Sequence, residues 1–209
     1  MLRLGLTGGM AVGKSTVASM LRAHDCPVLD ADTIGHELLE EGQDAYKEVV
    51  ATFGIDVLDQ HENIDRAALG KIVFAEPEKL KVLNAILHPR IRKVVEDWFA
   101  ALARSSDPPE VAVVEAALLF ESGFSQSLDK MMVCWCRPEQ QLERMLERGL
   151  TEDEARQRIA AQMSNEEKLK LADATIDCSG TIEETERLVA SALAKLKRSS
   201  AAPQKSSEA

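Results

Sequence analysis

"LTGGMAVGKSTVA", residues 6–18, is the stretch that decides the fold. It fits G-x-x-x-x-G-K-[ST] at Gly8, Gly13, Lys14 and Ser15, and it lies between an apolar run and the amphipathic segment "STVASMLRAH". In such a loop the backbone N–H groups point at phosphate oxygens, and the helix that follows directs its positive end at the same anion. A glycine-rich turn with a surface lysine is the alternative, but it requires neither a strand before the loop nor a helix after it. The stretch therefore predicts a site for a nucleoside triphosphate, with Lys14 at the β- and γ-phosphates and Ser15 on Mg²⁺.

Short apolar runs bounded by turn residues are typical of buried strands, and the sequence contains five of them. They cover residues 2–6, 27–29, 111–116, 131–136 and 174–178. Helical patterns lie between most of these runs, and strands that alternate with helices indicate a parallel sheet covered on both faces. We therefore expect an α/β fold with a five-stranded parallel sheet flanked by helices.

The connections between the predicted strands are uneven. About eighty residues separate the second strand from the third, far more than one crossover helix needs. We expect several helices there: "TIGHELLEEG" ending at Gly42, a helix capped by Asp65, one that starts at Pro77, and another that Pro89 opens. This segment, residues 33–107, is predicted to be an inserted helical substrate domain.

A second insertion follows the fourth strand. "PEQQLERMLERG" and "TEDEARQRIAAQM" predict two arginine-rich helices joined by a tight turn, and Thr151 with Glu154 has the spacing of a capping box. We expect this hairpin, residues 137–171, to be a helical lid. We expect a nucleotide-binding core made of residues 1–32, 108–136 and 172–198, with its last helix over 182–197. The polar segment at 199–209 is predicted to be a disordered tail.

The composition limits the ligands and the compartment. The net charge of −10 over 209 residues disfavours nucleic acid and anionic membranes as partners, because the summed field repels phosphate backbones and acidic lipids. The N-terminal apolar stretch is too short for a signal peptide, and no run of about 18 apolar residues could span a bilayer, so we expect a cytoplasmic protein. Cys26, Cys134, Cys136 and Cys178 form no CxxC pair and no zinc spacing, and we interpret them as reduced thiols.

Two acids end the second predicted strand, in "LDAD" at residues 29–32. Ligands of open α/β sheets lie beyond the carboxyl ends of the strands, and alternate residues of an extended segment face the same way, so we expect Asp30 and Asp32 to share a face there. A carboxylate in that place can orient a substrate hydroxyl or accept its proton. Asp30 has a second interpretation, as the N-cap of a helix that begins near Thr33. For Asp32 we favour the chemical role.

Two further acids follow the third apolar run. Glu115 closes the run beside the loop after the first strand, where a carboxylate can bind the hydration shell of Mg²⁺. Glu121 could instead point into an acceptor pocket. Both acids are also compatible with a position on the surface.

The predicted lid carries four arginines. Arg144 and Arg148 lie four residues apart on one helix face, and Arg156 and Arg158 follow in the next helix. Guanidinium groups on a closing lid stabilise the charge of a transferring phosphoryl group, although some of these four fit solvated pairs with glutamate. We expect Arg144 and Arg148 to be the functional ones. No guanine-reading N-K-x-D appears in the sequence, which favours a kinase over a GTPase.

Taken in order, these motifs resemble the dephospho-coenzyme A kinase family. The matching segments are "GLTGGMAVGKSTVA", "VLDAD", "IDRAALGKIVF", "LNAILHP", "LLFE", "QLERMLER", "RIAAQ" and "LADATID", which span most of the chain up to about residue 180. The resemblance implies a P-loop kinase fold and ATP-dependent phosphorylation of the ribose 3′-hydroxyl of dephospho-coenzyme A, the last step of coenzyme A biosynthesis, with ADP as the second product. The implied ligands are ATP, dephospho-coenzyme A and Mg²⁺, and we expect a monomer or a weak homo-oligomer.

The resemblance also implies roles for individual residues. It makes Asp32 the base toward the 3′-hydroxyl, and it places His88 and Pro89 on the acceptor side. Without the resemblance, "HP" indicates only a helix start and a packed histidine. The expected catalytic residues are Asp32, Lys14, Arg148 and Arg144, and the expected metal ligands are Ser15 and Glu115. ATP is expected to contact Gly9, Ala11, Val12, Gly13, Lys14, Ser15 and Thr16. The acceptor is expected to contact Thr7, Asp32, His88, Leu118, Leu119, Phe120 and Glu121.

The chain departs from the family pattern at several positions. "MAV" at residues 10–12 stands where the family usually has Ile, Gly and Ser, so a serine contact is lost, while backbone donation survives if the loop conformation is kept. Glu115 replaces an aspartate and Ala117 replaces a proline. "CSG" at residues 178–180 replaces N-x-G, so we expect any adenine contact there to use backbone groups.

The sequence leaves other functions open. A kinase for nucleoside monophosphates or a sugar acid would share the loop and the lid but need a different acceptor pocket. A regulatory module that binds a nucleotide without catalysis would not need acids and arginines around the loop. Nucleic-acid handling is disfavoured by the acidic net charge.

Overall fold

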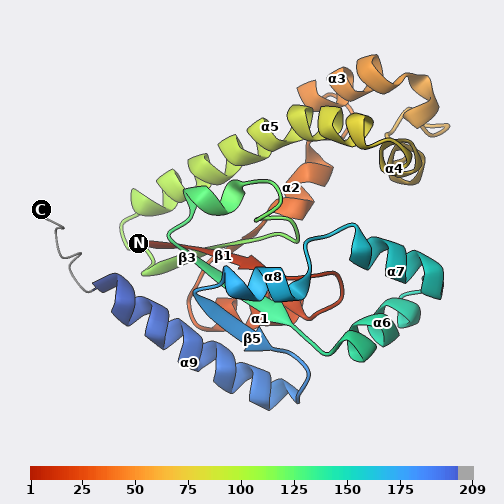
Figure 1. Ribbon diagram of the computed structural model, residues 1–209. Helices are drawn as coiled ribbons and strands as arrows, with labels where there is room; N and C mark the ends of the chain where they lie inside the picture. The colour runs from red at the N-terminus through yellow and green to blue at the C-terminus, as the bar shows by residue number, and fades with distance from the viewer. Residues whose placement is uncertain (202–209) are drawn as a thin grey trace, which may run out of the picture. The chain divides into compact units, whose positions relative to one another are not determined.

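The computed structural model describes residues 1–201, and a five-stranded parallel sheet with the strand order β2-β3-β1-β4-β5 forms its framework (Figure 1). The strands are β1 (Leu2–Thr7), β2 (Val28–Asp30), β3 (Val111–Glu115), β4 (Lys130–Trp135) and β5 (Ala174–Asp177). β1 is bonded on both sides, and Leu4 is the register partner of Val113 and of Lys130. All five predicted strands are confirmed, each to within one residue at either end.

The main core lies on one face of this sheet, together with α1 (Lys14–Ala23) and α9 (Ile182–Ala201). Leu2, Leu4 and Leu6 belong to it because alternate residues of a strand face the same side. Val17 and Leu21, four residues apart on α1, are fully buried in the same cluster. Burial of one such side chain contributes about 1.5–3 kcal/mol. This core therefore fixes the strand and the helix on either side of the loop at residues 8–13.

The described chain folds as two compact units, one made of Met1–Leu29 with the residues from Phe99 onward, and one made of Asp30–Trp98. The predicted cap of a helix in the second unit is confirmed, since Asp65 Oδ1 accepts the N–H groups of Ala67 and Ala68. The boundaries predicted for the inserted domain, residues 33–107, stay a prediction. The elements of the second unit are α2 (Ala31–Glu37), α3 (Asp44–Phe53), η1 (Ile55–Val57), α4 (Arg66–Ala75) and the first part of α5 (Pro77–Ala103).

Beyond β3, the first unit continues with η2 (Phe124–Ser127) and then, after β4, with α6 (Pro138–Glu147), α7 (Glu152–Ala160) and α8 (Asn165–Lys170). The helices α6 and α7 pack on each other, and the predicted capping box of Thr151 and Glu154 is present at the start of α7. The helix α8 is not among the predicted elements. It begins with a second capping box, made by Ser164 and Glu167, and the S-x-x-E pattern of "SNEE" is the sequence signal for it.

One predicted helix boundary is wrong. Pro89 does not open a new helix, because α5 runs from Pro77 to Ala103 with Pro89 inside it. Proline lacks the N–H that would donate to the carbonyl four residues earlier, at Ala85. The carbonyl of the next residue, Ile86, accepts from the Arg90 guanidinium at 2.6 Å, so a side-chain donor supplements this turn.

Two other helix ends differ from the predictions. The helix α2 begins at Ala31, before Thr33, and ends at Glu37, so Gly42 lies in the turn beyond it and is not its C-cap. The helix α9 extends to Ala201, so residues 199–201 of the predicted tail are helical, and residues 202–209 lie outside the described part of the chain. None of the helices within residues 1–201 combines the length and the apolar character that a membrane span needs.

Candidate active site

The loop between β1 and α1 packs tightly against the ends of β4 and β5. A Cβ atom at Gly8 would lie 2.3 Å from the carbonyl oxygen of Cys134, and one at Gly13 would lie 3.0 Å from the Cβ atom of Cys178. The φ angles of Gly8 and Gly13 are 153° and 110°, values that favour glycine. Space and backbone conformation therefore both require the glycines at the two ends of the motif.

The start of α1 is suited to an anion. Gly13 is its N-cap, so no side chain caps the N–H groups of its first turn, and these carry the partial positive charge of the helix. Lys14, which begins the helix, is half-buried, and its Nζ donates to the Gly9 carbonyl at 3.3 Å. Ser15 is exposed and Thr16 is half-buried. Amide, ammonium and hydroxyl donors thus meet at one end of one helix.

Lys14 and Glu115 both act on the buried thiol of Cys134. The pKa of Cys134 is raised well above its ordinary value, first by the hydrogen bond with Cys178 and then by burial; Lys14 lowers this pKa and Glu115 raises it. Glu115 ends β3, is 8% exposed as a residue, and is the register partner of Leu6, in the strand that leads into the phosphate loop.

Ala11 connects the loop to α6 and α7. Its φ of 60° is left-handed, a conformation in which the family's usual glycine is unstrained and alanine is not. The Ala11 side chain forms a small apolar cluster with Met145 of α6 and Ala155 of α7, and Met10 packs against the same cluster. Two of the residues that distinguish this loop from the usual family pattern, Met10 and Ala11, thus pack against α6 and α7.

Two glutamines bond to the backbone of the loop. Gln141 of α6 donates through Nε2 to the Met10 carbonyl at 2.8 Å, and the Met10 N–H donates to Oε1 of Gln162 at 3.2 Å. Gln141 is 4% exposed, so its amide is committed to this contact. Neither glutamine is among the predicted site residues, although both lie in segments that carry the family resemblance, "QLERMLER" and "RIAAQ".

The arginines of the predicted lid have different surroundings. Arg144 is half-buried and donates to the carbonyls of Val12 at 3.4 Å and Cys178 at 2.9 Å. Arg148 is exposed, and its guanidinium bonds to no residue within 1–201. Arg156 forms an exposed ion pair with Glu152 at 2.6 Å, as the solvated interpretation expects. Arg144 is therefore part of the support of the loop, whereas Arg148 is available to a ligand.

The segment after β3 is bonded to the end of β1 and to α8. Thr7, fully buried, donates through Oγ1 to the Ala117 carbonyl at 3.2 Å. Glu121 has two partners: its Oε1 lies 2.9 Å from Nζ of Lys168 and accepts the Met163 N–H at 3.0 Å. The contact of Glu121 with an acceptor stays a prediction.

The three apolar residues of "LLFE" differ in accessibility. Leu118 is 42% exposed and Leu119 is 2% exposed, while Phe120 is half-buried. The Leu119 side chain belongs to the interior. Leu118 and Phe120 are therefore the members of this predicted acceptor contact whose side chains a ligand can reach.

Asp30 and Asp32 do not form the predicted pair on one face of a strand, because the chain turns into α2 directly after Asp30. Asp30 caps this helix: its Oδ1 accepts the N–H groups of Asp32 at 2.9 Å and Thr33 at 3.1 Å. Of the two interpretations of Asp30, the structure supports the cap. Asp32 is exposed in the first turn of α2, within the unit Asp30–Trp98, and its catalytic role stays a prediction.

His88 is half-buried on α5. Burial lowers the pKa of its imidazole, and the nearby Arg92 lowers it further. The ring is therefore neutral near pH 7, where it can donate one hydrogen bond and accept another. Its place on the acceptor side stays a prediction.

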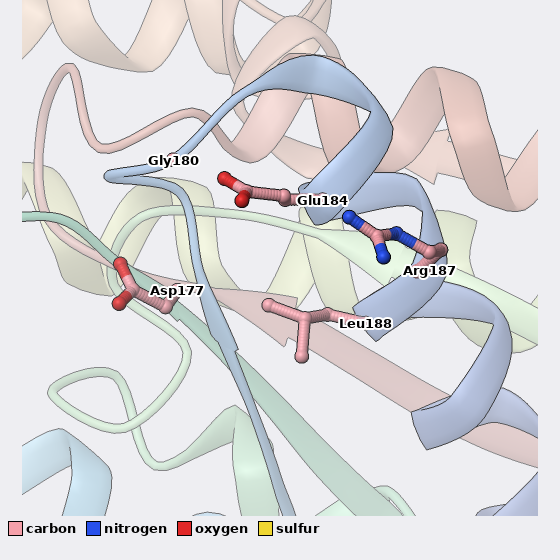
Figure 2. Close-up of a pocket in the computed structure, with 5 residues that line it drawn as sticks. All are labelled: Asp177, Gly180, Glu184, Arg187 and Leu188. Atoms are coloured by element: carbon pink, nitrogen blue, oxygen red, sulfur yellow. The ribbon is translucent and has the colours of Figure 1, made fainter.

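An open pocket of about 330 Å³ lies at the carboxyl end of β5, where the chain turns into α9 (Figure 2). Two carboxylates and one guanidinium border it, so its charge does not suit a triphosphate. Both carboxylates cap nearby backbone N–H groups, at distances of 2.9 and 2.8 Å. The lining residues are Asp177, Gly180, Glu184, Arg187 and Leu188.

The backbone expected to contact adenine, residues 178–180, is partly engaged. The Cys178 carbonyl accepts from Arg144, and the Ser179 carbonyl accepts from Gln140 Nε2 at 3.1 Å. A carbonyl oxygen has two lone pairs, so each of these groups retains capacity for a ligand donor.

A glycine loop between a central parallel strand and a helix without a side-chain cap, with Lys14 at the helix start, defines a P-loop nucleotide-binding protein of the α/β class. Solved structures share this fold. TT1252 from Thermus thermophilus is 33% identical with a TM-score of 0.78, over 93% of this chain and 97% of that one. A dephospho-CoA kinase from Campylobacter jejuni is 28% identical with a TM-score of 0.68, over 95% of this chain and 98% of that one.

The family model for dephospho-CoA kinase matches residues 2–184. The dephospho-CoA kinase of Geobacillus kaustophilus is 47% identical over 187 residues, 89% of this chain and 92% of the relative. That of Aquifex aeolicus is 41% identical over 198 residues, 95% of this chain and 99% of the relative. The chain belongs to the dephospho-CoA kinase family.

Proposed function

We propose that this protein transfers the γ-phosphoryl group of ATP to the ribose 3′-hydroxyl of dephospho-CoA, which yields CoA and ADP in the last step of CoA biosynthesis. The observation that carries the proposal is the loop at residues 8–13 with Lys14 at the start of α1, in a chain that matches the dephospho-CoA kinase family over residues 2–184. The four free cysteines support a cytoplasmic location.

The start of α1 supports the binding of the ATP phosphates. The N–H groups of the loop and of the first helical turn would donate to phosphate oxygens, and Lys14 would exchange its contact with the Gly9 carbonyl for the β- and γ-phosphates. Arg148, exposed on the lid, would then pair with the transferring phosphoryl group. Arg144 would act mainly by keeping the loop and the end of β5 in place.

Ser15 and Glu115 fit a role as ligands of Mg²⁺. A hydroxyl and a carboxylate supply the oxygen atoms that this ion prefers, and Mg²⁺ usually takes only one or two protein ligands besides water and phosphate. Glu115 ends β3 as the register partner of Leu6, in the strand that leads into the phosphate loop, which supports this role. When bound, Mg²⁺ would neutralise charge on the β- and γ-phosphates.

Five residues are assigned roles toward the acceptor. Asp32 would orient the 3′-hydroxyl and accept its proton, which requires an exposed, ionised carboxylate. His88, neutral near pH 7, would hydrogen-bond to the acceptor, and Leu118 with Phe120 would contact its apolar atoms. Thr7 is fully buried and would act by holding the Ala117 carbonyl.

Mass spectrometry of dephospho-CoA after incubation with Mg²⁺-ATP and the protein tests this function. We expect one added phosphate, located on the ribose. Lys14→Ala should abolish turnover, and Asp32→Asn should lower kcat by about 10²-fold or more with little change in ATP affinity, because a general base acts in the transition state.

The same assay separates the other functions. Nucleoside monophosphates and a sugar acid serve as competing acceptors, and phosphate found only on one of these would identify a different small-molecule kinase. ATP binding without consumption would identify a regulatory module. An Asp32→Asn enzyme with near-normal kcat would remove that residue from the mechanism.

A further inference from the structure

Lys168 is a fully buried cation outside the residues assigned to the reaction. It lies on α8 with 0% exposure. Its Nζ donates to the Ala117 carbonyl at 2.8 Å and lies 2.9 Å from Oε1 of Glu121, whose side chain is 23% exposed. Both acceptors belong to the segment that follows β3.

Burial of an ammonium group is costly unless good acceptors replace its water. A buried ion pair is also weak support for stability, since an apolar pair of similar volume can be as stable. A buried ammonium group instead restricts the positions of its acceptors, because it remains stable only where both acceptor oxygens stay within hydrogen-bond distance. The arrangement at Lys168 therefore indicates a constraint on the position of residues 117–121.

The two acceptors of Lys168 each hold a second donor. The Ala117 carbonyl also accepts from Thr7, the last residue of β1 before the phosphate loop. Oε1 of Glu121 also accepts the N–H of Met163, in the connection between α7 and α8. One ammonium group thus joins the strand that enters the loop, the segment 117–121 and the end of the lid.

The connection between α7 and α8 reaches the phosphate loop as well. Gln162, next to Met163, accepts the Met10 N–H at 3.2 Å. Two neighbouring residues of this connection therefore bond to two different segments. Gln162 bonds to the loop that receives ATP, and Met163 bonds to Glu121 of the acceptor segment. A shift of the acceptor segment would move the lid relative to the loop.

We propose that Lys168 is a positioning residue of the kinase reaction: through Ala117 and Glu121 it sets the place of the acceptor segment relative to the phosphate loop and the lid. The inference rests on the proposed function. Lys168 acts through these residues and not by contact with ATP, because both of its bonds are made to residues 117–121.

Steady-state kinetics of Lys168→Met test the proposal, since methionine replaces the apolar part of the buried side chain and removes the ammonium group. We expect kcat/KM for dephospho-CoA to fall at least tenfold, while the Kd of ATP, measured by direct titration, changes less than about threefold. Lys168→Arg should recover part of the loss, because it restores a cation to the same acceptors. Lys170→Met, an exposed lysine on the same helix, is the matched control and should behave as wild type.

A double-mutant cycle with Glu121→Gln gives a second readout. If Lys168 acts through Glu121, the two losses in kcat/KM should be strongly non-additive, with the double variant close to the worse single variant. Lys168→Arg and Glu121→Gln carry the test if Lys168→Met does not fold, as judged by circular dichroism.

Several outcomes overturn the proposal. A folded Lys168→Met enzyme with kcat/KM within twofold of wild type would show that the charge has no positioning role, and equal losses in ATP affinity and turnover would show a general structural effect. Additive losses in the cycle would separate Lys168 from Glu121. Wild-type protein that adds no phosphate to dephospho-CoA would instead refute the proposed function, and the inference with it.

Discussion

Substitution of the single left-handed alanine of the phosphate loop provides a quantitative test of the loop conformation. Ala11 has φ 60° and packs in the same apolar cluster as Ala155, which lies in the middle of α7. Both side chains are buried, with 6% and 0% exposure. Ala11→Gly and Ala155→Gly therefore remove the same methyl group from the same cluster but from opposite backbone conformations.

The expected magnitudes differ because one backbone is strained and the other is not. Loss of a buried methyl group costs about 0.8 kcal/mol in either variant. At Ala155 glycine also costs about 1 kcal/mol through its low helix propensity, so the free energy of unfolding should fall by about 2 kcal/mol. At Ala11, glycine relieves the left-handed strain, which stabilises the folded state by about 1–2 kcal/mol. The lost methyl group costs about 0.8 kcal/mol and the freer unfolded chain costs about 0.4–1 kcal/mol, so the net change in the free energy of unfolding is near zero.

Urea denaturation of the two variants and the wild type measures these changes. In thermal melts, Ala155→Gly should lower Tm by about 4–8 °C, and Ala11→Gly should leave it nearly unchanged. If Ala11→Gly destabilises the protein as much as Ala155→Gly, the loop alanine is not held in a left-handed conformation and the strain argument is refuted.

Two further substitutions test the surroundings of the site. Arg144→Met should lower the free energy of unfolding by about 1.5–3 kcal/mol, because the carbonyls of Val12 and Cys178 lose a charged donor. Arg148→Met, at an exposed arginine, should change it by less than about 0.5 kcal/mol in the same denaturation assay. Equal effects would contradict the structural role of Arg144. The pKa of His88 is lower in the folded protein than in the unfolded protein, where it is about 6.5. Neutral His88 therefore favours the folded state above about pH 6.5, and this contribution to stability is lost as the pH falls below that value. His88→Gln should therefore lose less stability than wild type between about pH 7.5 and about pH 5.5, and identical pH profiles would show that His88 is not the source.

Local chemistry explains which parts of the fold the sequence predicts. The phosphate loop, the strands and the capping box at Thr151 depend on residues close together in the chain, and the structure confirms them. The glycines of the loop are predictable for the same reason, because a positive φ is a local requirement. The second capping box, at Ser164, has an equally local signal in "SNEE".

Contacts between distant segments explain what the sequence does not predict. Gln141 meets the Met10 carbonyl across 131 positions, and Lys168 meets the Ala117 carbonyl across 51, so no spacing rule could pair them. The wrong prediction that Asp30 and Asp32 share a face has another cause: an Asp can end a strand or cap a helix, and the alternate spacing assumed that the strand continued. The catalytic assignments of Asp32 and Arg148 depend on bound substrates and stay predictions.

The bonding of β1 on both sides has a consequence for the thermodynamics of nucleotide binding. Edge strands fray more easily than strands with neighbours on both sides. The phosphate loop follows β1, which lies between β3 and β4. Side chains from α6 and from the α7–α8 connection further restrict the loop before any ligand arrives. The loop is thus preorganised, and association with a triphosphate carries little additional loss of chain entropy.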